Sequence, residues 1–370
     1  MYSQNDLDDA VAAGALSAAA ASSLRAYMEQ QRDGPAVDEE HFRLISGFND
    51  IFVAIASAIL LFAVGWIGQS AGQSMGLVID HDGPGPLAPA AVAATAWGLA
   101  LFFTARRRMA LPSIMLLLAF VGGIFLASGF GLVVGVGEAR LEDNAVLGGI
   151  LGALAGAIAT GAAWLHWKRF RVPITIAAGA AAVSAIAVGL LVATLGGVEG
   201  QNIQNIILGF VLLLGIGVFL FAMRWDASDP SRITRRSDVA FWLHLLAAPM
   251  IVHPVFTLLG LNDGSATIAE GFVVIALYVV LGLAALAIDR RALLVSALAY
   301  VLYALSELFK QVGAVELNVA LTALVIGSAL LLLSAYWHQA RSLVVRQLPE
   351  GLRTRLPTLD RLAATPQPAA

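Results

Sequence analysis

The sequence predicts an all-α fold: a polytopic integral membrane helix bundle with about ten transmembrane helices and both termini cytoplasmic. Of the 370 residues, 59% are hydrophobic and only 13% are charged, whereas a soluble domain carries about 25% charged residues. The apolar residues also fall into ten separate runs. Each run approaches the roughly 20 residues that a helix needs to cross a bilayer, so most of the chain is predicted to lie in the membrane.

The chain divides into three predicted parts. Residues 1–47 form a polar lead, in which a helix that ends at Gly14 and a second helix capped by Ser17 make a cytoplasmic hairpin. Residues 338–370 form an amphipathic basic tail that is expected to lie on the cytoplasmic leaflet and to end in disorder. Residues 48–337 form the ten-span domain, with spans at 48–68, 87–105, 112–134, 146–166, 173–196, 203–223, 239–261, 266–287, 292–311 and 317–337.

The distribution of basic residues predicts the orientation of these spans. If the connecting segments alternate between the two sides, all of the 22 lysines and arginines except Arg140 and Lys310 fall on one side. Short cytoplasmic loops retain Lys and Arg, so that side is predicted to be the cytoplasm. Basic residues that are nearly all Arg, together with abundant Ala and Gly, are typical of a GC-rich bacterial genome. We therefore expect the bacterial inner membrane.

Several function classes are excluded or disfavoured by composition and motifs. The net charge of -3 argues against nucleic acid as a partner, and the absence of cysteine excludes thiol chemistry and Cys-ligated metals. The sequence contains neither a nucleotide-binding glycine motif nor a serine elbow or zinc signature. No catalytic residue, metal or cofactor is predicted, and the interpretation leans away from an enzyme.

Glycines in the fourth span predict close helix packing. Gly148, Gly152 and Gly156 recur every four residues and would share one helix face. Small residues let helix backbones approach closely in lipid. The face would meet another helix of the same chain or, alternatively, a second copy.

The seventh predicted span contains two histidines and two prolines within an apolar segment. His244 and His253 lie nine positions apart, about 13.5 Å along a straight helix and on opposite faces. Pro249 and Pro254 would free backbone carbonyls and act as hinges. Each histidine is either a neutral group that is hydrogen-bonded to a neighbouring helix or a part of a proton-handling or substrate-binding pair along a bent helix.

Other polar residues predict a pocket lined by spans six to nine. Glu307 and Lys310 are three positions apart and can pair on one helix face. Asn205 opens span six and Glu270 opens span eight at the level predicted for His253. Ionisable groups inside a membrane are functional candidates. The alternative interpretation is an interfacial Glu–Lys pair that extends to the headgroups.

The stretch Asp238-Val-Ala-Phe-Trp-Leu-His244, with His253-Pro254 downstream and the Leu7…Gly14-Ala-Leu16-Ser17 lead, resembles uncharacterised bacterial multi-span membrane proteins. The resemblance covers the layout of the whole chain and implies no catalytic residue. The predicted function is to bind or transport a small solute, with or without a proton. The alternative is a membrane-anchored scaffold or sensor that meets a protein partner through the N-terminal hairpin.

Overall fold

The computed structural model describes residues 11–24, 48–80, 82–142, 144–196, 201–229, 234–259, 268–291 and 317–353, together with the separate positions 293–294, 298, 301–302, 305–306, 309 and 356. Within these residues every regular element is a helix and none is a strand, so the predicted all-α class is confirmed there. Contacts divide the chain into two compact units, one of Met1–Arg43 with Asp360–Ala370 and one of Leu44–Leu359. In the first unit residues 18–24 are helical. The predicted cap is also confirmed, because the Ser17 hydroxyl accepts a hydrogen bond from the Ala20 N–H at 3.1 Å.

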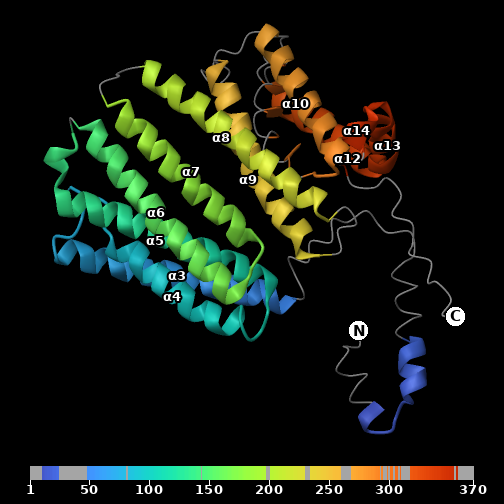
Figure 1. Cartoon of the computed structure of the whole chain (residues 1–370), viewed down its shortest axis with the longest axis horizontal. Coiled ribbons are helices and arrows are strands. Elements are labelled where there is room, and N and C mark those ends of the chain that lie inside the picture. The colour runs from blue at the N-terminus through green and yellow to red at the C-terminus, as the bar shows by residue number, and fades with distance from the viewer. Residues whose placement is uncertain are drawn as a thin grey trace. The chain divides into compact units, whose positions relative to one another are not determined.

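The second unit is built from long helices that follow one another along the chain. Figure 1 shows α3 to α9 as a series of neighbouring rods, in which each helix of the α3–α7 series packs against the next, and α7 packs against both α8 and α9. The helices are α3 (Phe48–Ser74), α4 (Leu87–Phe103), α5 (Ala110–Val136), α6 (Ala145–Phe170), α7 (Ile174–Thr194), α8 (Gln201–Ala227), α9 (Arg235–Leu258), α10 (Ile268–Ile288), α12 (Asn318–Ala335), α13 (Trp337–Gln347) and α14 (Glu350–Arg353).

The helices are compatible with a multi-pass membrane protein but do not establish ten spans. Six helices in the described part are long and apolar enough to cross a bilayer, or seven if the bent pair α12 and α13 counts as one. Helix α4 has 17 residues, about 25 Å at 1.5 Å per residue, which is shorter than the roughly 30 Å hydrocarbon core. The predicted span at 292–311 lies largely outside the described residues. The tenfold count and the cytoplasmic termini therefore stay predictions.

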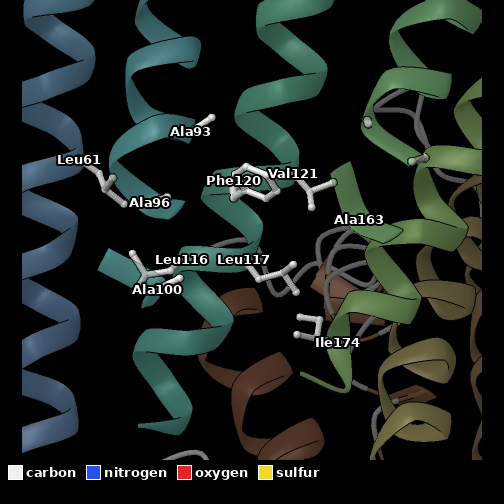
Figure 2. Close-up of a cluster of buried hydrophobic side chains, with 12 residues drawn as sticks. Leu61, Ala93, Ala96, Ala100, Leu116, Leu117, Phe120, Val121, Ala163 and Ile174 are labelled. Atoms are coloured by element: carbon white, nitrogen blue, oxygen red, sulfur yellow. The ribbon is translucent and has the colours of Figure 1, made fainter. Parts of the chain in front are cut away.

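A cluster of apolar side chains holds α3 to α7 together. Figure 2 shows Leu116, Leu117 and Phe120 of α5 at its centre, between small residues of α4 and of α6. Leu116 and Leu117 are completely buried. Alanines on α4 let the helix backbones approach, and the dispersion contacts that result hold helices together where lipid is as apolar as the side chains. The labelled members are Leu61, Ala93, Ala96, Ala100, Leu116, Leu117, Phe120, Val121, Ala163 and Ile174.

Helices α6 and α7 approach each other closely, and their contact corrects the predicted glycine face. A Cβ atom added at Gly149 would lie 2.6 Å from the carbonyl oxygen of Gly189, and one at Gly156 would lie 3.0 Å from the Ile186 side chain. At Gly148 and Gly152 no described atom lies within 4 Å of that position, apart from the adjoining part of α6 itself. Residues four apart drift about 40° around a helix. The three glycines therefore point in successively different directions around α6. Of the three, only Gly156 contacts α7.

The tail begins with a sharp bend rather than a straight continuation. Helices α12 and α13 are inclined by 76° to each other. Trp337, Arg341 and Val345, spaced four apart, are buried on one face of α13, and this helix contacts α10. One face of the predicted amphipathic helix is thus buried inside the protein. Contact of this helix with the cytoplasmic leaflet stays a prediction.

Candidate functional site

The candidate site begins with Asp226, at the end of α8. The sixth predicted span stops at residue 223, but α8 continues to Ala227. The extra turn places Asp226 on the same helix face as Phe219 and Ala222, because residues three and four apart lie on one side of a helix. Ala222 is completely buried and Asp226 is 2% exposed. The carboxylate is therefore directed into the bundle rather than into a loop.

His244 faces this carboxylate from α9. The helix starts after Thr234, whose hydroxyl accepts a hydrogen bond from the Arg236 N–H at 3.2 Å. The third turn of α9 then carries His244, whose Nε2 atom lies 3.0 Å from Oδ2 of Asp226. The Phe219 ring meets the imidazole edge to face at 5.2 Å between centroids. The imidazole thus has a carboxylate on one side and an aromatic ring beside it.

Arg290 completes the cluster from the end of α10. Asp289 has a positive φ of 57°, and the Arg290 N–H donates to the Ala285 carbonyl at 2.9 Å. This pattern is a Schellman turn, in which the left-handed residue is usually glycine and occasionally a short polar residue. The turn directs the guanidinium of Arg290 back across the bundle to Asp226.

The guanidinium binds the carboxylate with two nitrogen atoms. Arg290 Nε donates to Oδ2 of Asp226 at 3.2 Å, and Nη2 donates to Oδ1. Nη2 also donates to the Ser237 carbonyl at 3.1 Å. Two-nitrogen contact with a carboxylate is the strongest and most directional form of an ion pair. The four residues Asp226, Ser237, His244 and Arg290 are called the Asp226 cluster below.

The Asp226 cluster is closed to solvent. His244 is 0% exposed and Arg290 is 3% exposed. Charges in such surroundings persist only when they are paired and hydrogen-bonded. With a neutral imidazole, Asp226 and Arg290 cancel and the cluster is uncharged. Any proton added to these four residues would leave them with a net positive charge, and the carboxylate of Asp238, which interacts with Arg290 through space, is the further acid to consider.

A second set of contacts extends the cluster to α13. Asp289 Oδ1 accepts a hydrogen bond from Trp337 Nε1 at 2.8 Å and lies 3.8 Å from Arg341 Nε. The guanidinium of Arg291 lies over the Trp337 ring, 4.7 Å from its centroid. Three consecutive charged residues after α10 thus hold different parts of the bundle: Arg290 holds α8 and α9, and its two neighbours hold α13.

The structure does not gather the predicted pocket residues around His244. Asn205 is exposed near the start of α8, 21 residues before Asp226 and therefore about 30 Å from the Asp226 cluster along the helix axis. His253 is exposed as well. The side chain of Glu270, and both Glu307 and Lys310, lie outside the described residues. The pocket around these last three residues stays a prediction, and His244 belongs to a different place.

The two prolines of α9 do not unwind the helix. Pro249 and Pro254 both lie inside an unbroken α9. A proline removes the hydrogen bond to the carbonyl four residues earlier, which for Pro254 is the carbonyl of Met250. A Cβ at Gly215 of α8 would lie 2.9 Å from that carbonyl oxygen. Because Gly215 has no side chain, α8 can pack directly against this turn of α9. The predicted hinge is not seen, since α9 is continuous through both prolines.

A second buried histidine provides a comparison. His166 of α6 is completely buried, and its Nδ1 atom lies 3.2 Å from the Thr175 hydroxyl. Its other neighbours are aromatic, with the Phe170 ring at 4.6 Å between centroids. No group of three or more metal-ligating side chains occurs within the described residues. His244 therefore differs from His166 in having a carboxylate partner, which can share its proton.

Sequence reasoning missed Asp226, Ser237 and Arg290. The predicted span six ends at residue 223, which leaves Asp226 in the connection to span seven, and Arg290 contributes only to the count of basic residues that indicates orientation. A signal was present, since the ends of spans six and eight and the start of span seven are predicted on the same side of the membrane. Charged residues at the same predicted depth on those three spans could have been grouped into a site. The same reasoning groups His253, Asn205 and Glu270 on the opposite side.

Comparison of the chain with family models, with curated proteins and with solved structures finds no match. The case for a function therefore rests on the geometry of the Asp226 cluster and on the sequence.

Proposed function

We propose that this chain is a multi-pass protein of the bacterial inner membrane that binds or transports a small solute in step with a proton. The Asp226 cluster is its proton-sensitive centre. One observation carries the proposal: a fully buried imidazole lies 3.0 Å from a carboxylate that a buried arginine also binds. Ionisable groups that pair inside a membrane bundle are characteristic of proton relays and substrate pathways.

Protonation of the Asp226 cluster would change its net charge and therefore its stability in the closed state. An added proton leaves the four residues of the Asp226 cluster with one net positive charge, whether it resides on the imidazole or on the carboxylate. The carboxylate of Asp238, which interacts with Arg290 through space, offsets part of that charge. An unpaired buried charge costs several kcal/mol. Separating the helices lets water reach the charge and removes that cost, so protonation and opening favour each other. Because the cluster joins α8, α9 and the end of α10, its opening would loosen one end of the bundle.

The solute pathway belongs to the part of the proposal that comes from sequence. His253, Asn205, Glu270, Glu307 and Lys310 would line its opening on the side away from the cytoplasm. The Asp226 cluster would close the cytoplasmic end. Both termini would be cytoplasmic, as the arginine distribution predicts. This arrangement puts the ionisable centre and the solute entrance at opposite ends of one route.

Proton movement in proteoliposomes tests this function. Vesicles that hold the full chain and an internal pH-sensitive dye are given a small-molecule extract of bacterial cells. We expect internal pH to change with the native protein, because the solute and a proton cross together. His244→Gln keeps a hydrogen-bonding side chain but cannot be protonated. We therefore expect the initial rate to fall by about 100-fold or more, the contribution typical of a group that transfers protons.

The matched control is His166→Gln, since it removes the other buried imidazole, which has a hydroxyl partner instead of a carboxylate. This variant should retain the native rate. If protein-free vesicles respond as fast as native ones, or if both histidine variants lose the response equally, the proposal is wrong.

A second candidate function is a scaffold or sensor that acts through the N-terminal hairpin. The observation in its favour is that Met1–Arg43 belongs to a compact unit separate from Leu44–Leu359. On that interpretation the membrane helices serve as an anchor, and a chain that lacks residues 1–43 would lose its partner. On the transport interpretation the same truncated chain would keep its proton movement.

A further inference from the structure

Six basic side chains gather at one end of the α4–α7 part of the bundle. Three follow α4, and three lie at the end of α6 and in the turn into α7. Figure 2 shows Ala100 of α4, Leu117 of α5 and Ile174 of α7 in one buried cluster, and these residues adjoin the two turns. The turns therefore lie at the same end of the helices. The six exposed side chains, called the cationic patch below, are Arg106, Arg107, Arg108, Lys168, Arg169 and Arg171.

The cationic patch has no acidic partner within the part of the chain that the structure describes. Segments 83–137 and 144–198, which contain α4 to α7, include neither Asp nor Glu. None of the six side chains forms an ion pair or a side-chain hydrogen bond with a described residue. A group of like charges that the protein does not neutralise attracts a partner of opposite charge. The N–H donors of the patch are therefore open to an external anion.

Two of the cations lie over exposed aromatic rings. Lys168 Nζ is 3.9 Å from the centroid of the Trp164 ring, and the Arg107 guanidinium is 5.5 Å from that of the Phe102 ring. Trp164 is 58% exposed and Phe102 is 43% exposed. Aromatic rings at the ends of membrane helices prefer the boundary between acyl chains and headgroups, and long basic side chains there extend toward the headgroups. The patch thus has the composition of a membrane interface.

We propose that the cationic patch binds the headgroups of anionic phospholipids, with phosphates on the basic side chains and with Trp164 and Phe102 against the first acyl carbons. A lipid surface is favoured over a soluble anion because the patch adjoins the ends of α5, α6 and α7, all of which are long and apolar enough to cross a bilayer. Basic clusters directly beside membrane helices attract anionic lipids. The inference requires that these helices lie in a membrane, but it does not depend on the movement of a solute or a proton.

Lipid quenching in reconstituted bilayers tests this surface. The chain has no cysteine, so Leu165→Cys or Ile150→Cys can carry a single fluorophore. Both positions are exposed and lie near opposite ends of α6, and Leu165 shares a helix face with Lys168 and Arg169. Phosphatidylglycerol or phosphatidylcholine with a spin label high on the acyl chain is added in equal amounts to phosphatidylcholine bilayers that hold the full chain. We expect phosphatidylglycerol to quench the label at position 165 more strongly than phosphatidylcholine, and to have no advantage at position 150.

Charge removal identifies the source of the preference. Two triple variants replace either the basic residues at 106–108 or those at 168, 169 and 171 by Gln. Each should lose most of the excess quenching at position 165, because one basic residue near an anionic surface contributes about fivefold in affinity. Replacement of the arginines at 106–108 by Lys keeps the charge and should keep the preference. Arg140→Gln, which removes an exposed arginine just beyond the other end of α5, should keep it as well.

Several results would overturn the proposal. Equal quenching by the two lipids at position 165, or the same phosphatidylglycerol preference at position 150, would do so without any change in the patch. This comparison therefore remains decisive if circular dichroism shows that a Gln variant is unfolded. A preference that both folded triple variants retain would also overturn the proposal. Loss of the preference on addition of pyrophosphate, but not of sodium chloride at matched ionic strength, would assign the patch to a soluble phosphate compound instead of the membrane.

Discussion

Arg290→Met is expected to destabilise the protein by about 3–5 kcal/mol, the cost of removing one partner from a buried ion pair. The reason is that Asp226 is 2% exposed and would lose the guanidinium that neutralises it. The Ser237 carbonyl would lose a hydrogen bond at the same time. Reversible unfolding in mixed micelles, followed by tryptophan fluorescence, measures the change.

Two further variants identify the cause. Arg346→Met removes an exposed arginine on α13 and should change stability by less than about 0.5 kcal/mol. Asp226→Asn combined with Arg290→Met removes both charges and should recover a large part of the loss, because no uncompensated charge remains. A double variant as unstable as Arg290→Met alone would show that the ion pair is not what stabilises this end of the bundle.

Alanine substitutions at two nearby glycines of α6 should have opposite effects. In Gly149→Ala the new methyl group would lie 2.6 Å from the Gly189 carbonyl oxygen and 2.9 Å from Ala193 Cα. Both neighbours are backbone, which cannot move aside, so α6 and α7 must separate. Overpacking of this kind costs about 1–3 kcal/mol. The separation also weakens the most extensive helix pair of the bundle.

Gly152→Ala is the matched control. Apart from the adjoining part of α6, no described atom lies within 4 Å of the added methyl group. Alanine is also more favourable than glycine in a helix interior by about 1 kcal/mol. Unfolding midpoints of the two variants should therefore fall on opposite sides of the native value. A Gly149→Ala protein as stable as native would mean that the two helices do not approach as closely as the structure indicates.

The general class of the fold could be predicted from sequence because it depends on long-range averages. Runs of about 20 apolar residues and few charges are sufficient to predict membrane helices. Helix ends were less predictable, because hydrogen bonding carries a helix beyond its apolar run. The three residues from Arg224 to Asp226 show this: hydropathy ends α8 before them, whereas the helix includes all three.

The site was predicted only in part because it depends on which faces meet. The two histidines and the two prolines of α9 were recognised by their residue type. The carboxylate partner of His244 comes from another helix, 18 positions away, and Arg290 from a third segment, 64 positions from Asp226. Periodicity within one helix does not determine such pairings. Of the glycine repeat, only Gly156 makes a close contact within the chain, because residues four apart drift around a helix and do not all meet the same neighbour. Contact of Gly148 and Gly152 with a second copy stays a prediction.

A distance measurement across the Asp226 cluster tests the central claim that protonation opens this end of the bundle. The chain has no cysteine, so cysteines placed at the exposed positions Ser228 and Leu283 can carry a pair of spin labels. From about pH 8 to about pH 5, the range in which histidine ordinarily titrates, the label distance should increase in native protein and in His166→Gln. It should stay constant in His244→Gln. A native distance that does not change with pH, or a His244→Gln protein that opens as native does, would contradict the account.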